Sequence, residues 1–491
     1  MQNDPNRAFV TWCEIIAHQV TKTRFDFVNR YSKIVALRHI YMASQEINLQ
    51  VNISNKQILS IALPITAAII VPQINFIINN IFLGGLGQRS LALAGITGVY
   101  YLIFAVVGHG LNNGLQALIS RRAGENRIDA IGNLFSQGVR IAIVFAMMGI
   151  IITYFVAPWV LRWSLHDADS VNICVRFLNI RILGLPFLYV YQMRNALLVG
   201  TNQSKYLIIG TATEAITNVF FDYSLIYGKF GMPNLGFDGA AYASILSEFA
   251  GLAVIFVVIR MNGITKQLHL FKNWAFDLAN TKLIMQQSYP LILQHVISII
   301  SWEFFYILIE HHGERDLAVS NTMRNIFGFF GCFTWAFAAT TNTMVSNVIG
   351  QGLQHKVEEL IYRIIKWSVG FAILVCMFLN LFPHTFLSIY GQGENFIQSA
   401  IPVLRVVSTA LVLMSVSVVW MNAVTGTGNS KMNLFSEMAA ITLYCIYVYI
   451  VLEKMKLPIA WGWASEWIYW TTILIPSFWY IKSGRWKTRK I

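Results

Sequence analysis

The chain has 491 residues, of which 56% are hydrophobic and only 12% are charged, and its formal net charge at pH 7 is +13. A soluble domain carries about 25% charged residues, so this composition excludes an ordinary soluble protein and predicts an integral membrane protein. The basic residues are spread over predicted loops and form no aromatic-laced patch, which argues against a nucleic-acid partner.

The chain opens with a polar extension over residues 1–53. This segment lacks an apolar core and is therefore not a secretory signal. The tetrapeptide Ser54-Asn55-Lys56-Gln57 has the spacing of a capping box and predicts the start of the first helix. Met42 is an alternative start, so the residues leave open whether 1–53 is a real extension.

Runs of apolar residues then recur along the whole chain, each long enough to cross about 30 Å of hydrocarbon as a helix. The first six predicted spans lie at about 57–83, 91–119, 134–160, 172–199, 205–228 and 238–260. The second six lie at about 283–309, 317–348, 361–382, 396–425, 432–452 and 457–481. The sequence therefore predicts an all-α membrane protein with twelve transmembrane helices.

The two sets of spans are copies of one unit. Pro64 and Pro290 are 226 residues apart, and the same offset holds without a gap to Lys205 and Lys431. Because six spans per copy is an even number, the two repeats enter the bilayer the same way and are parallel. We expect an N-lobe at 54–265 and a C-lobe at 266–485 around a central cavity, a basic tail at 486–491, and a kink at each of the two prolines.

The distribution of basic residues predicts the orientation. If the N-terminus is inside, the cytoplasmic segments hold 24 Lys and Arg residues, whereas the outer loops hold 6. This asymmetry places both termini in the cytoplasm. The chain also lacks a G-x-x-x-x-G-K-[ST] phosphate loop, and its five cysteines have no paired spacing, so we expect no cofactor, no disulfide and no permanent metal.

One apolar span carries an acid at a position that requires a function or a partner. Asn218 and Asp222 are four residues apart and share one helix face. A carboxylate in mid-span costs at least about 2.5–3.5 kcal/mol on insertion scales, so it should face a cavity or a partner. Such a group releases a proton when a cation arrives, or holds sodium transiently. The alternative is neutralisation by a buried arginine such as Arg181 or Arg194.

Over about residues 54–485 the chain resembles the multidrug and toxic compound extrusion (MATE) family, which belongs to a larger group that also holds lipid-linked oligosaccharide flippases. The similarity is carried jointly by motifs in the first copy: Leu63-Pro64, Asn79 to Gly87, Ala117 to Glu125, Leu198 to Ser204, Asn218-x-x-x-Asp222, and Leu235 to Ser244.

The resemblance implies a cation-coupling site in the N-lobe. By matching position, the site would comprise Asn79, Asn218, Asp222 and Ser244. Asn79 departs from the family pattern, because an amide stands where the family has an acid. This replacement of an acid by an amide leaves three options open: a single-proton site at Asp222, a sodium site of lower charge, or a relocated coupling site. The alternative role for Asn79 is a helix–helix hydrogen bond.

The C-lobe offers candidates for a relocated coupling or substrate site. Glu303 lies thirteen residues after Pro290. It would serve in coupling or substrate binding, or alternatively form a salt bridge to Arg324 or Arg405. Trp302, Tyr306 and Trp335 would line a cavity for flat organic cations, or simply pack against lipid or the core. Four more acids fall in or near spans, although nothing in their spacing singles them out: Glu214, Glu248, Glu437 and Glu466.

These features favour a secondary antiporter of the cell membrane, not an enzyme, that exports amphipathic cationic compounds in exchange for protons or sodium by rocking its lobes. The expected partners are small organic substrates, the coupling ion and the lipid bilayer, with no obligate protein partner. The main alternative is a flippase for a lipid-linked saccharide, which would use cavity-facing arginines from the set Arg181, Arg194, Arg324 and Arg405. A third alternative is an intramembrane enzyme, for which the only dense group of catalytic residue types in the sequence is the short outer turn from Glu310 to Glu314.

Overall fold

The computed structural model describes residues 47–165, 167–272 and 274–489, so Met42 and most of the predicted extension over 1–53 lie outside the described residues. Throughout this described part every regular element is helical. Each predicted apolar span falls on a long helix, which confirms the all-α fold class and the two-copy architecture.

The N-terminal copy spans the following helices: α2 (Asn55–Gly84), α3 (Gln88–Gly124), α4 (Ile128–Ser164), α5 (Ala168–Arg181), η1 (Ile182–Gly184), α6 (Leu185–Gly200), η2 (Ser204–Tyr206), α7 (Leu207–Tyr227), α8 (Phe237–Met261) and the short α9 (Ile264–Gln267). The segments α5, η1 and α6 follow one another without a loop and together form the fourth span.

The C-terminal copy spans α10 (Leu278–Glu310), α11 (Glu314–Gly350), η3 (Gln354–Lys356), α12 (Val357–Leu381), α13 (Pro383–Ser388), α14 (Glu394–Gly426), α15 (Ser430–Val448), the π-helical η4 (Tyr449–Lys454), α16 (Ile459–Trp463), α17 (Ser465–Lys482) and η5 (Arg485–Thr488). Within the described residues, nine helical segments are long and apolar enough to cross a membrane. The helices α7, α11 and α17 complete the twelve predicted spans.

The first span begins where the sequence predicts, but only half of the capping box forms. The Ser54 hydroxyl accepts a hydrogen bond from the backbone N–H of Gln57 at 3.2 Å, which satisfies one free amide of the first turn. The side chain of Gln57 does not return the bond; its Nε2 donates to Asn202 in the loop before η2. The start of α2 is thereby tied to the start of α7. Pro64 and Pro290 both lie inside continuous helices.

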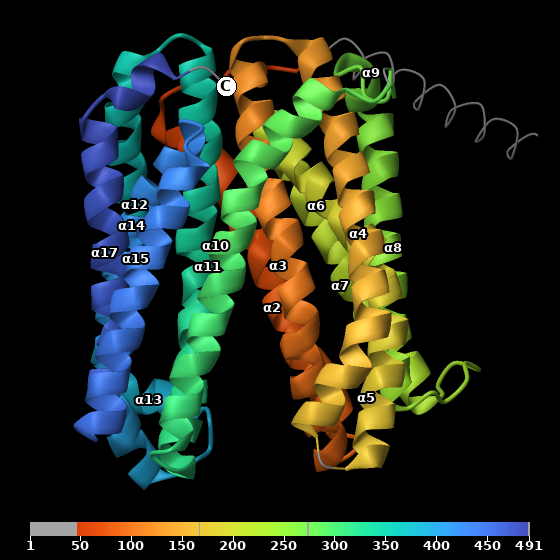
Figure 1. The fold of residues 1–491 in the computed structure, drawn as a ribbon, viewed down its shortest axis with the longest axis vertical. Coiled ribbons are helices and arrows are strands. Elements are labelled where there is room, and N and C mark those ends of the chain that lie inside the picture. The colour runs from red at the N-terminus through yellow and green to blue at the C-terminus, as the bar shows by residue number, and fades with distance from the viewer. Residues whose placement is uncertain (1–46, 166, 273, 490–491) are drawn as a thin grey trace, which may run out of the picture.

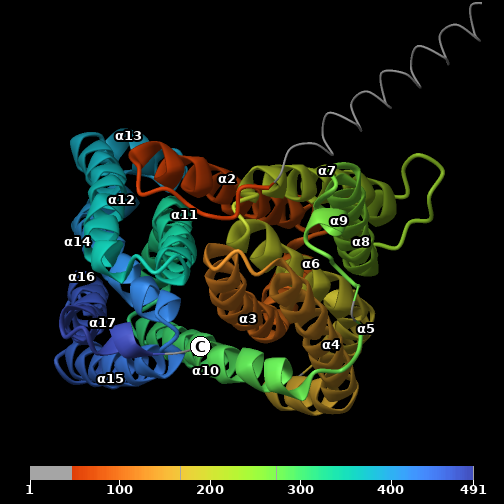
Figure 2. The same ribbon diagram turned by 90° about the horizontal axis from the view of Figure 1, so that it is seen from above.

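The two copies form two lobes that meet at one end and separate at the other (Figure 1). Seen from above, α2 and α10 lie at opposite ends of the boundary between the lobes (Figure 2). Each packs against the other lobe, α2 on α11 and α10 on α3. The parallel repeat predicts this exchange, because a pseudo-twofold axis along the membrane normal relates the two lobes.

The buried core shows where the lobes join. One hydrophobic cluster contains residues of both lobes, among them Ile58, Leu118, Met344 and Val348. Two further clusters stay within single lobes, one around Phe305 in the C-lobe and one around Ile226 in the N-lobe. The shared cluster lies at the end where α3 and α11 terminate, so apolar burial closes this end of the molecule and leaves the other end divided.

Polar contacts seal the same end. Gln116 of α3 donates from Nε2 to the hydroxyl of Thr343 at 2.7 Å and to the carbonyl of Ala339 at 2.9 Å, both on α11. The amide of Asn347 ties α11 to the segment that precedes α2, since its Nδ2 donates to the Leu49 carbonyl at 2.8 Å and its Oδ1 accepts from the backbone N–H of Val51 at 3.1 Å.

Two glycines related by the repeat allow the backbones of α3 and α11 to cross at this seal. A Cβ atom added at Gly124 would lie 2.1 Å from the carbonyl oxygen of Asn347, and one added at Gly350 would lie 2.3 Å from the carbonyl oxygen of Arg121. The two glycines are 226 residues apart, and so are the two residues whose carbonyls they face, Arg121 and Asn347. The crossing is therefore built twice from the same part of the repeat.

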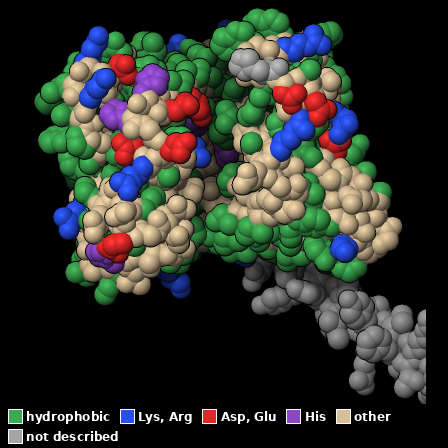
Figure 3. Space-filling view, turned by 90° about the horizontal axis from the view of Figure 1, so that it is seen from below, with side chains coloured by type: hydrophobic (Ala, Val, Ile, Leu, Met, Phe, Trp, Pro, Cys, Tyr) green, Lys and Arg blue, Asp and Glu red, His purple; other side chains and the backbone are tan. Residues whose placement is uncertain are grey.

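At the opposite end the surface is hollowed between the lobes, as the space-filling view from below shows (Figure 3). The half of α3 that approaches this end exposes apolar side chains, among them Leu91, Val99 and Leu102. The predicted central cavity is therefore a cleft that opens at the end away from the seal.

Candidate functional site

A cluster of amides and one acid lies between α2 and α7 in the N-lobe. The two helices run side by side in a nearly constant register. Phe82 pairs with Tyr227 through a 2.7 Å bond, and Asn75 pairs with Asn218 through a 2.6 Å bond, offsets of 145 and 143 residues. The same register places Asn79 beside Asp222, one helical turn beyond the Asn75–Asn218 pair. Three predicted site residues, Asn79, Asn218 and Asp222, thus lie along one helix–helix contact.

The cluster is short of hydrogen-bond partners. Asp222 is fully buried, and neither of its carboxylate oxygens has a partner among the described residues. The same holds for Oδ1 of Asn75, Oδ1 of Asn79 and Nδ2 of Asn218. Buried polar atoms are nearly always paired, so four unpaired oxygens and one unpaired amide nitrogen at one place indicate a site for a ligand, and the excess of oxygens favours one that supplies positive charge or protons.

Asn75 belongs to the cluster although the sequence interpretation did not include it. It lies four residues before Asn79 and therefore on the same face of α2. That spacing is the signal that would have identified it. The hydroxyl of Ser244, in contrast, donates to the carbonyl of Ala240 on its own helix at 2.9 Å, and the structure does not bring it into the α2–α7 cluster by a hydrogen bond.

Neither of the two arginines considered as partners of Asp222 forms an ion pair with it in the described structure. Arg181 forms a buried ion pair with Glu248, at 2.5 Å between Nη2 and Oε1, and its guanidinium lies 3.9 Å from the ring centroid of Tyr101. The guanidinium of Arg194 lies 3.8 Å from the ring centroid of Tyr191. In the described structure Asp222 therefore has no ion-pair partner.

The C-lobe candidates lie in an aromatic cluster. Trp302 is 6.2 Å from Tyr306 and 6.5 Å from Trp463, measured between ring centroids, and the guanidinium of Arg324 lies 5.0 Å from the Tyr306 ring. Trp335 instead pairs with Trp470 of α17 at 6.4 Å.

Glu303 is half-buried beside the aromatic cluster. The predicted alternative, a salt bridge from Glu303 to Arg324 or Arg405, does not form within the described structure.

Two acids that the sequence did not single out are buried in the C-lobe. Glu466 accepts a hydrogen bond from the indole N–H of Trp470 at 3.0 Å. Glu437 accepts bonds from α10 and α17. Both carry the same signal that identified Asp222, an acidic side chain within an apolar span. Glu437 also has a polar residue one helical turn away, Asn433, so its spacing repeats that of Asn218 and Asp222, whereas Glu466 has no amide or acid at that distance.

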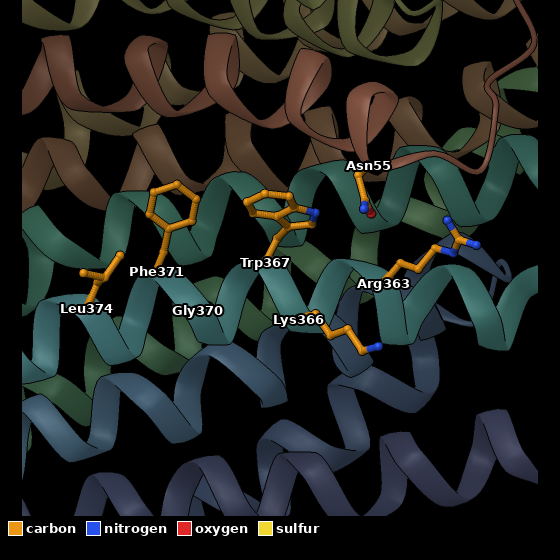
Figure 4. A pocket seen from close by; sticks show the side chains of 7 residues that line it. All are labelled: Asn55, Arg363, Lys366, Trp367, Gly370, Phe371 and Leu374. Carbon is orange, nitrogen blue, oxygen red and sulfur yellow. The ribbon is translucent and has the colours of Figure 1, made fainter.

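A separate lateral pocket of about 610 Å³ lies between the start of α2 and α12. Figure 4 shows its lining side chains, with Arg363 and Lys366 near one end and Phe371 and Leu374 towards the other. Its lining includes no residue of the α2–α7 cluster. Among the described residues, no group of three or more His, Cys, Asp or Glu side chains is placed to hold a metal ion.

Comparison with known proteins agrees with this geometry. A family model described as MatE matches residues 64–224 and again residues 290–450, and the two matches begin 226 residues apart. The probable multidrug resistance protein NorM of Thermotoga maritima is 21% identical over 450 residues, which cover 89% of this chain and 94% of that protein. A protein of the same description from Pasteurella multocida is 21% identical over 395 residues, covering 80% and 84%.

Solved structures share the fold. An outward-facing multidrug resistance MATE family transporter of the MOP superfamily superposes with a TM-score of 0.81 at 19% identity, covering 90% of this chain and 98% of that chain. A MOP superfamily transporter from Pyrococcus furiosus superposes with a TM-score of 0.82 at 17% identity, covering 91% and 100%.

Proposed function

The chain belongs to the MatE family, and we propose that it is a secondary antiporter that exports amphipathic, cationic organic compounds in exchange for protons or sodium ions. The observation that carries the proposal is Asp222, a fully buried carboxyl whose two oxygens have no partner in the described structure. Relatives described as multidrug resistance proteins support the class of substrate.

An unpaired buried carboxylate is unstable unless something neutralises it. A proton neutralises it by forming the acid, and a sodium ion does so by taking oxygen ligands. The amide oxygens of Asn75 and Asn79 are the free oxygens beside Asp222, so either ion finds its charge partner on α7 and polar partners on α2. Binding therefore stabilises the contact between α2 and α7, and release weakens it.

The replacement of an acid by Asn79 sets the charge of this site. With a single carboxyl, the N-lobe cluster binds one positive charge and becomes neutral. Asn79 cannot release a proton, but its carbonyl oxygen still serves as a ligand. Coupling in this lobe is then a one-charge process centred on Asp222.

The cleft supplies the other half of the mechanism. The basic-residue asymmetry puts both termini, and with them the sealed end of the lobes, in the cytoplasm of a cell that carries the protein in its plasma or inner membrane. The conformation described here then faces outward. Rocking of the lobes about the seal would expose the same cleft to the cytoplasm, and ion occupancy at Asp222 would bias the exchange between the two states.

The aromatic cluster of the C-lobe suits the proposed substrates. Aromatic faces attract organic cations, and Trp302 and Tyr306 present such faces beside the half-buried carboxylate of Glu303. Trp335 adds an aromatic face next to Trp470. We assign these four residues to substrate binding within the proposal.

A flippase is less well supported. It would need arginines that face the cleft and are free to bind a pyrophosphate. Arg181 is held by Glu248 and Arg194 is buried over Tyr191, so two of the four candidates are unavailable.

Dye-cation uptake into inverted membrane vesicles tests the proposal. One of two imposed gradients, of pH or of sodium, should drive uptake of the dye. Asp222→Asn should abolish ion-driven uptake, because the amide keeps the size of the side chain and cannot become charged. Asp169→Asn is the matched control, since Asp169 is an exposed acid paired with Arg89 at 2.7 Å.

Uptake that persists at the wild-type rate in Asp222→Asn would show that coupling does not depend on the N-lobe site. Absence of uptake under both gradients for the wild-type protein would contradict drug antiport itself. In that case uptake of fluorescent lipid-linked saccharides, with Arg324→Ala and Arg405→Ala as variants, would test the flippase.

A further inference from the structure

Glu437 of α15 is buried in the C-lobe among donors from two other helices. Its Oε1 accepts hydrogen bonds from the hydroxyl of Ser298 on α10 and from the phenol of Tyr469 on α17, the latter at 2.5 Å. Its Oε2 accepts from Nε2 of Gln294 on α10 at 3.1 Å. The side chain is 1% exposed, so the site is a built, enclosed constellation and not a surface acid.

No cation compensates this carboxyl. In the part of the chain that the structure describes, Glu437 forms no ion pair, and its partners on α10 and α17 are neutral donors. The titratable groups around its partner Tyr469 are Tyr444, whose ring lies 6.1 Å from the Tyr469 ring, and the acid Glu466.

The remaining neighbours bring no positive charge either. His295 of α10 directs its ring to Asn113 of the N-lobe, and α14 contributes the sulfur of Met421 to Gln294. Lys431 at the start of α15 is exposed. Glu453 and Lys454 of η4 lie 16 or more residues along the helix, or about 24 Å at 1.5 Å per residue.

The hydroxyl of Ser298 gives the carboxyl of Glu437 two hydrogen-bonding arrangements, one for each protonation state. It lies within bonding distance of Glu437, and it also lies 3.0 Å from the carbonyl oxygen of Gln294 in its own helix. When Glu437 is ionised, Ser298 donates to the carboxylate. When Glu437 is protonated, the acid donates to Ser298, and Ser298 turns its proton to the Gln294 carbonyl.

Tyr469 and Gln294 keep their donor roles in both arrangements. The heavy atoms need not move, and no polar group loses its partner when the proton arrives. A metal cation would fit poorly, because the groups around the carboxyl point hydrogen-bond donors at it. The geometry thus selects a proton as the ligand.

We propose that Glu437 is a proton-binding carboxyl of the C-lobe, which takes up and releases one proton in the transport cycle in addition to the ion bound at Asp222. This inference rests on the proposed antiport, but the protonation itself is a property of the folded chain. The proton bonds to a carboxylate oxygen of Glu437 on uptake and returns to water on release, with no other bond made or broken. Ser298 and Tyr469 are partly exposed, so the buried carboxyl is one hydrogen bond away from the molecular surface.

Infrared difference spectroscopy of the full-length protein in lipid, recorded while the pH is stepped, tests the protonation without any transport. Glu437→Gln should remove one protonated-carboxyl C=O band from the pH difference spectrum. Ser298→Ala should keep this band and shift its frequency, because the acid loses its acceptor. Glu359→Gln is the control, since Glu359 is an exposed acid paired with Arg363 at 2.7 Å. A pH difference spectrum of Glu437→Gln identical to that of the wild type would overturn the proposal.

The role in the cycle is tested by the ratio of protons to dye, measured in proteoliposomes from the gradient at which dye flux reverses. The ratio should fall by one proton in folded Glu437→Gln, whose amide fits the same partners, while dye transport continues. An unchanged ratio would overturn the coupling role. If the wild-type protein carries no dye, the antiport proposal fails, and the infrared result still decides whether Glu437 binds a proton.

Discussion

At the scale of single residues, the α2–α7 cluster shows how one amide changes the charge that a site can bind. Asn75 and Asn218 hold the two helices in register by a 2.6 Å bond, which leaves Asn79 and Asp222 as neighbours with free oxygens. The arrangement needs only one added charge to become neutral. An acid at position 79 would require a second charge, because two adjacent carboxylates do not both stay ionised without compensation.

Asn79→Asp should therefore add a second titrating group to the site. The new pair of carboxyls would share a proton and titrate as a coupled unit. We expect proton-driven dye uptake into inverted vesicles to continue to higher pH than in the wild type, because the pair holds its last proton more tightly. The pH profile of the initial uptake rate measures this shift.

The matched control for this prediction is Asn80→Asp. Residue 80 projects about 100° away from residue 79 around the helix, so its acid should not join the pair. An Asn79→Asp profile that coincides with those of Asn80→Asp and the wild type would show that position 79 does not communicate with Asp222.

At the scale of the helix, the start of α10 links the two lobes through its cap. Asp277 lies outside the membrane span, and its carboxylate accepts bonds from the backbone N–H of Asn280 at 3.1 Å, from the Asn280 side chain, and from Nδ2 of Asn133 on α4. The bond from the Asn280 backbone, followed by those from the side chains, lowers the pKa of Asp277 below its ordinary value.

Asp277→Ala should destabilise the protein by about 0.5–2 kcal/mol at neutral pH, the usual cost of losing a helix N-cap. Because the folded pKa is depressed, the stabilisation is present above the ordinary carboxyl pKa of about 3.9 and is lost as the pH falls through the lower folded value. Thermal unfolding in detergent should show a difference from the wild type at pH 7 that shrinks in acid. Asp277→Asn retains a good helix cap and should lose much less stability than Asp277→Ala. Equal losses of stability in the two variants would contradict the capping role.

The helices themselves are the part of this protein that a sequence predicts well. Long apolar runs have few alternatives to spanning a membrane, and the 226-residue offset fixes the two copies, so the spans and the duplication were predictable. The pair Asn218 and Asp222 was predictable too, because both lie on one helix face.

The C-lobe network around Glu437 was not predictable in the same way. Its partners Ser298 and Tyr469 are 139 and 32 residues away, and only the packing of α10 and α17 against α15 brings them together. Half of the predicted capping box failed for a related reason, since Asn202 competes for the side chain of Gln57 and is 145 residues distant. Contacts between helices far apart in sequence leave no periodic signal along the chain.

At the scale of the whole molecule, the seal between the lobes determines which end of the cleft is open. The seal combines a shared apolar cluster, the amide bridges from Gln116 and Asn347, and the crossing of α3 over α11 at Gly124 and Gly350. The crossing is the least tolerant part, because backbone atoms face each other there and cannot move aside as a flexible side chain does. Small residues allow this close approach of membrane helices.

Gly124→Ala and Gly350→Ala should each push α3 and α11 apart and weaken the sealed state. The added methyl groups would sit 2.1 Å and 2.3 Å from carbonyl oxygens of the opposite lobe, far inside van der Waals contact. The equilibrium should then shift towards the conformation in which this end is open. A cysteine placed at Leu118, which is buried in the shared apolar cluster of the seal, should react faster with a membrane-impermeant maleimide in both variants than in the same cysteine variant with both glycines intact.

Gly98→Ala is the control for the same helix, because a Cβ atom there meets nothing within 4 Å. The labelling rates of the two seal variants should resemble each other, since the repeat builds both contacts alike. Faster labelling in only one of them would show that the lobes do not share the seal symmetrically. No acceleration in either would mean that the crossing yields by a local shift and does not control which end of the cleft is closed.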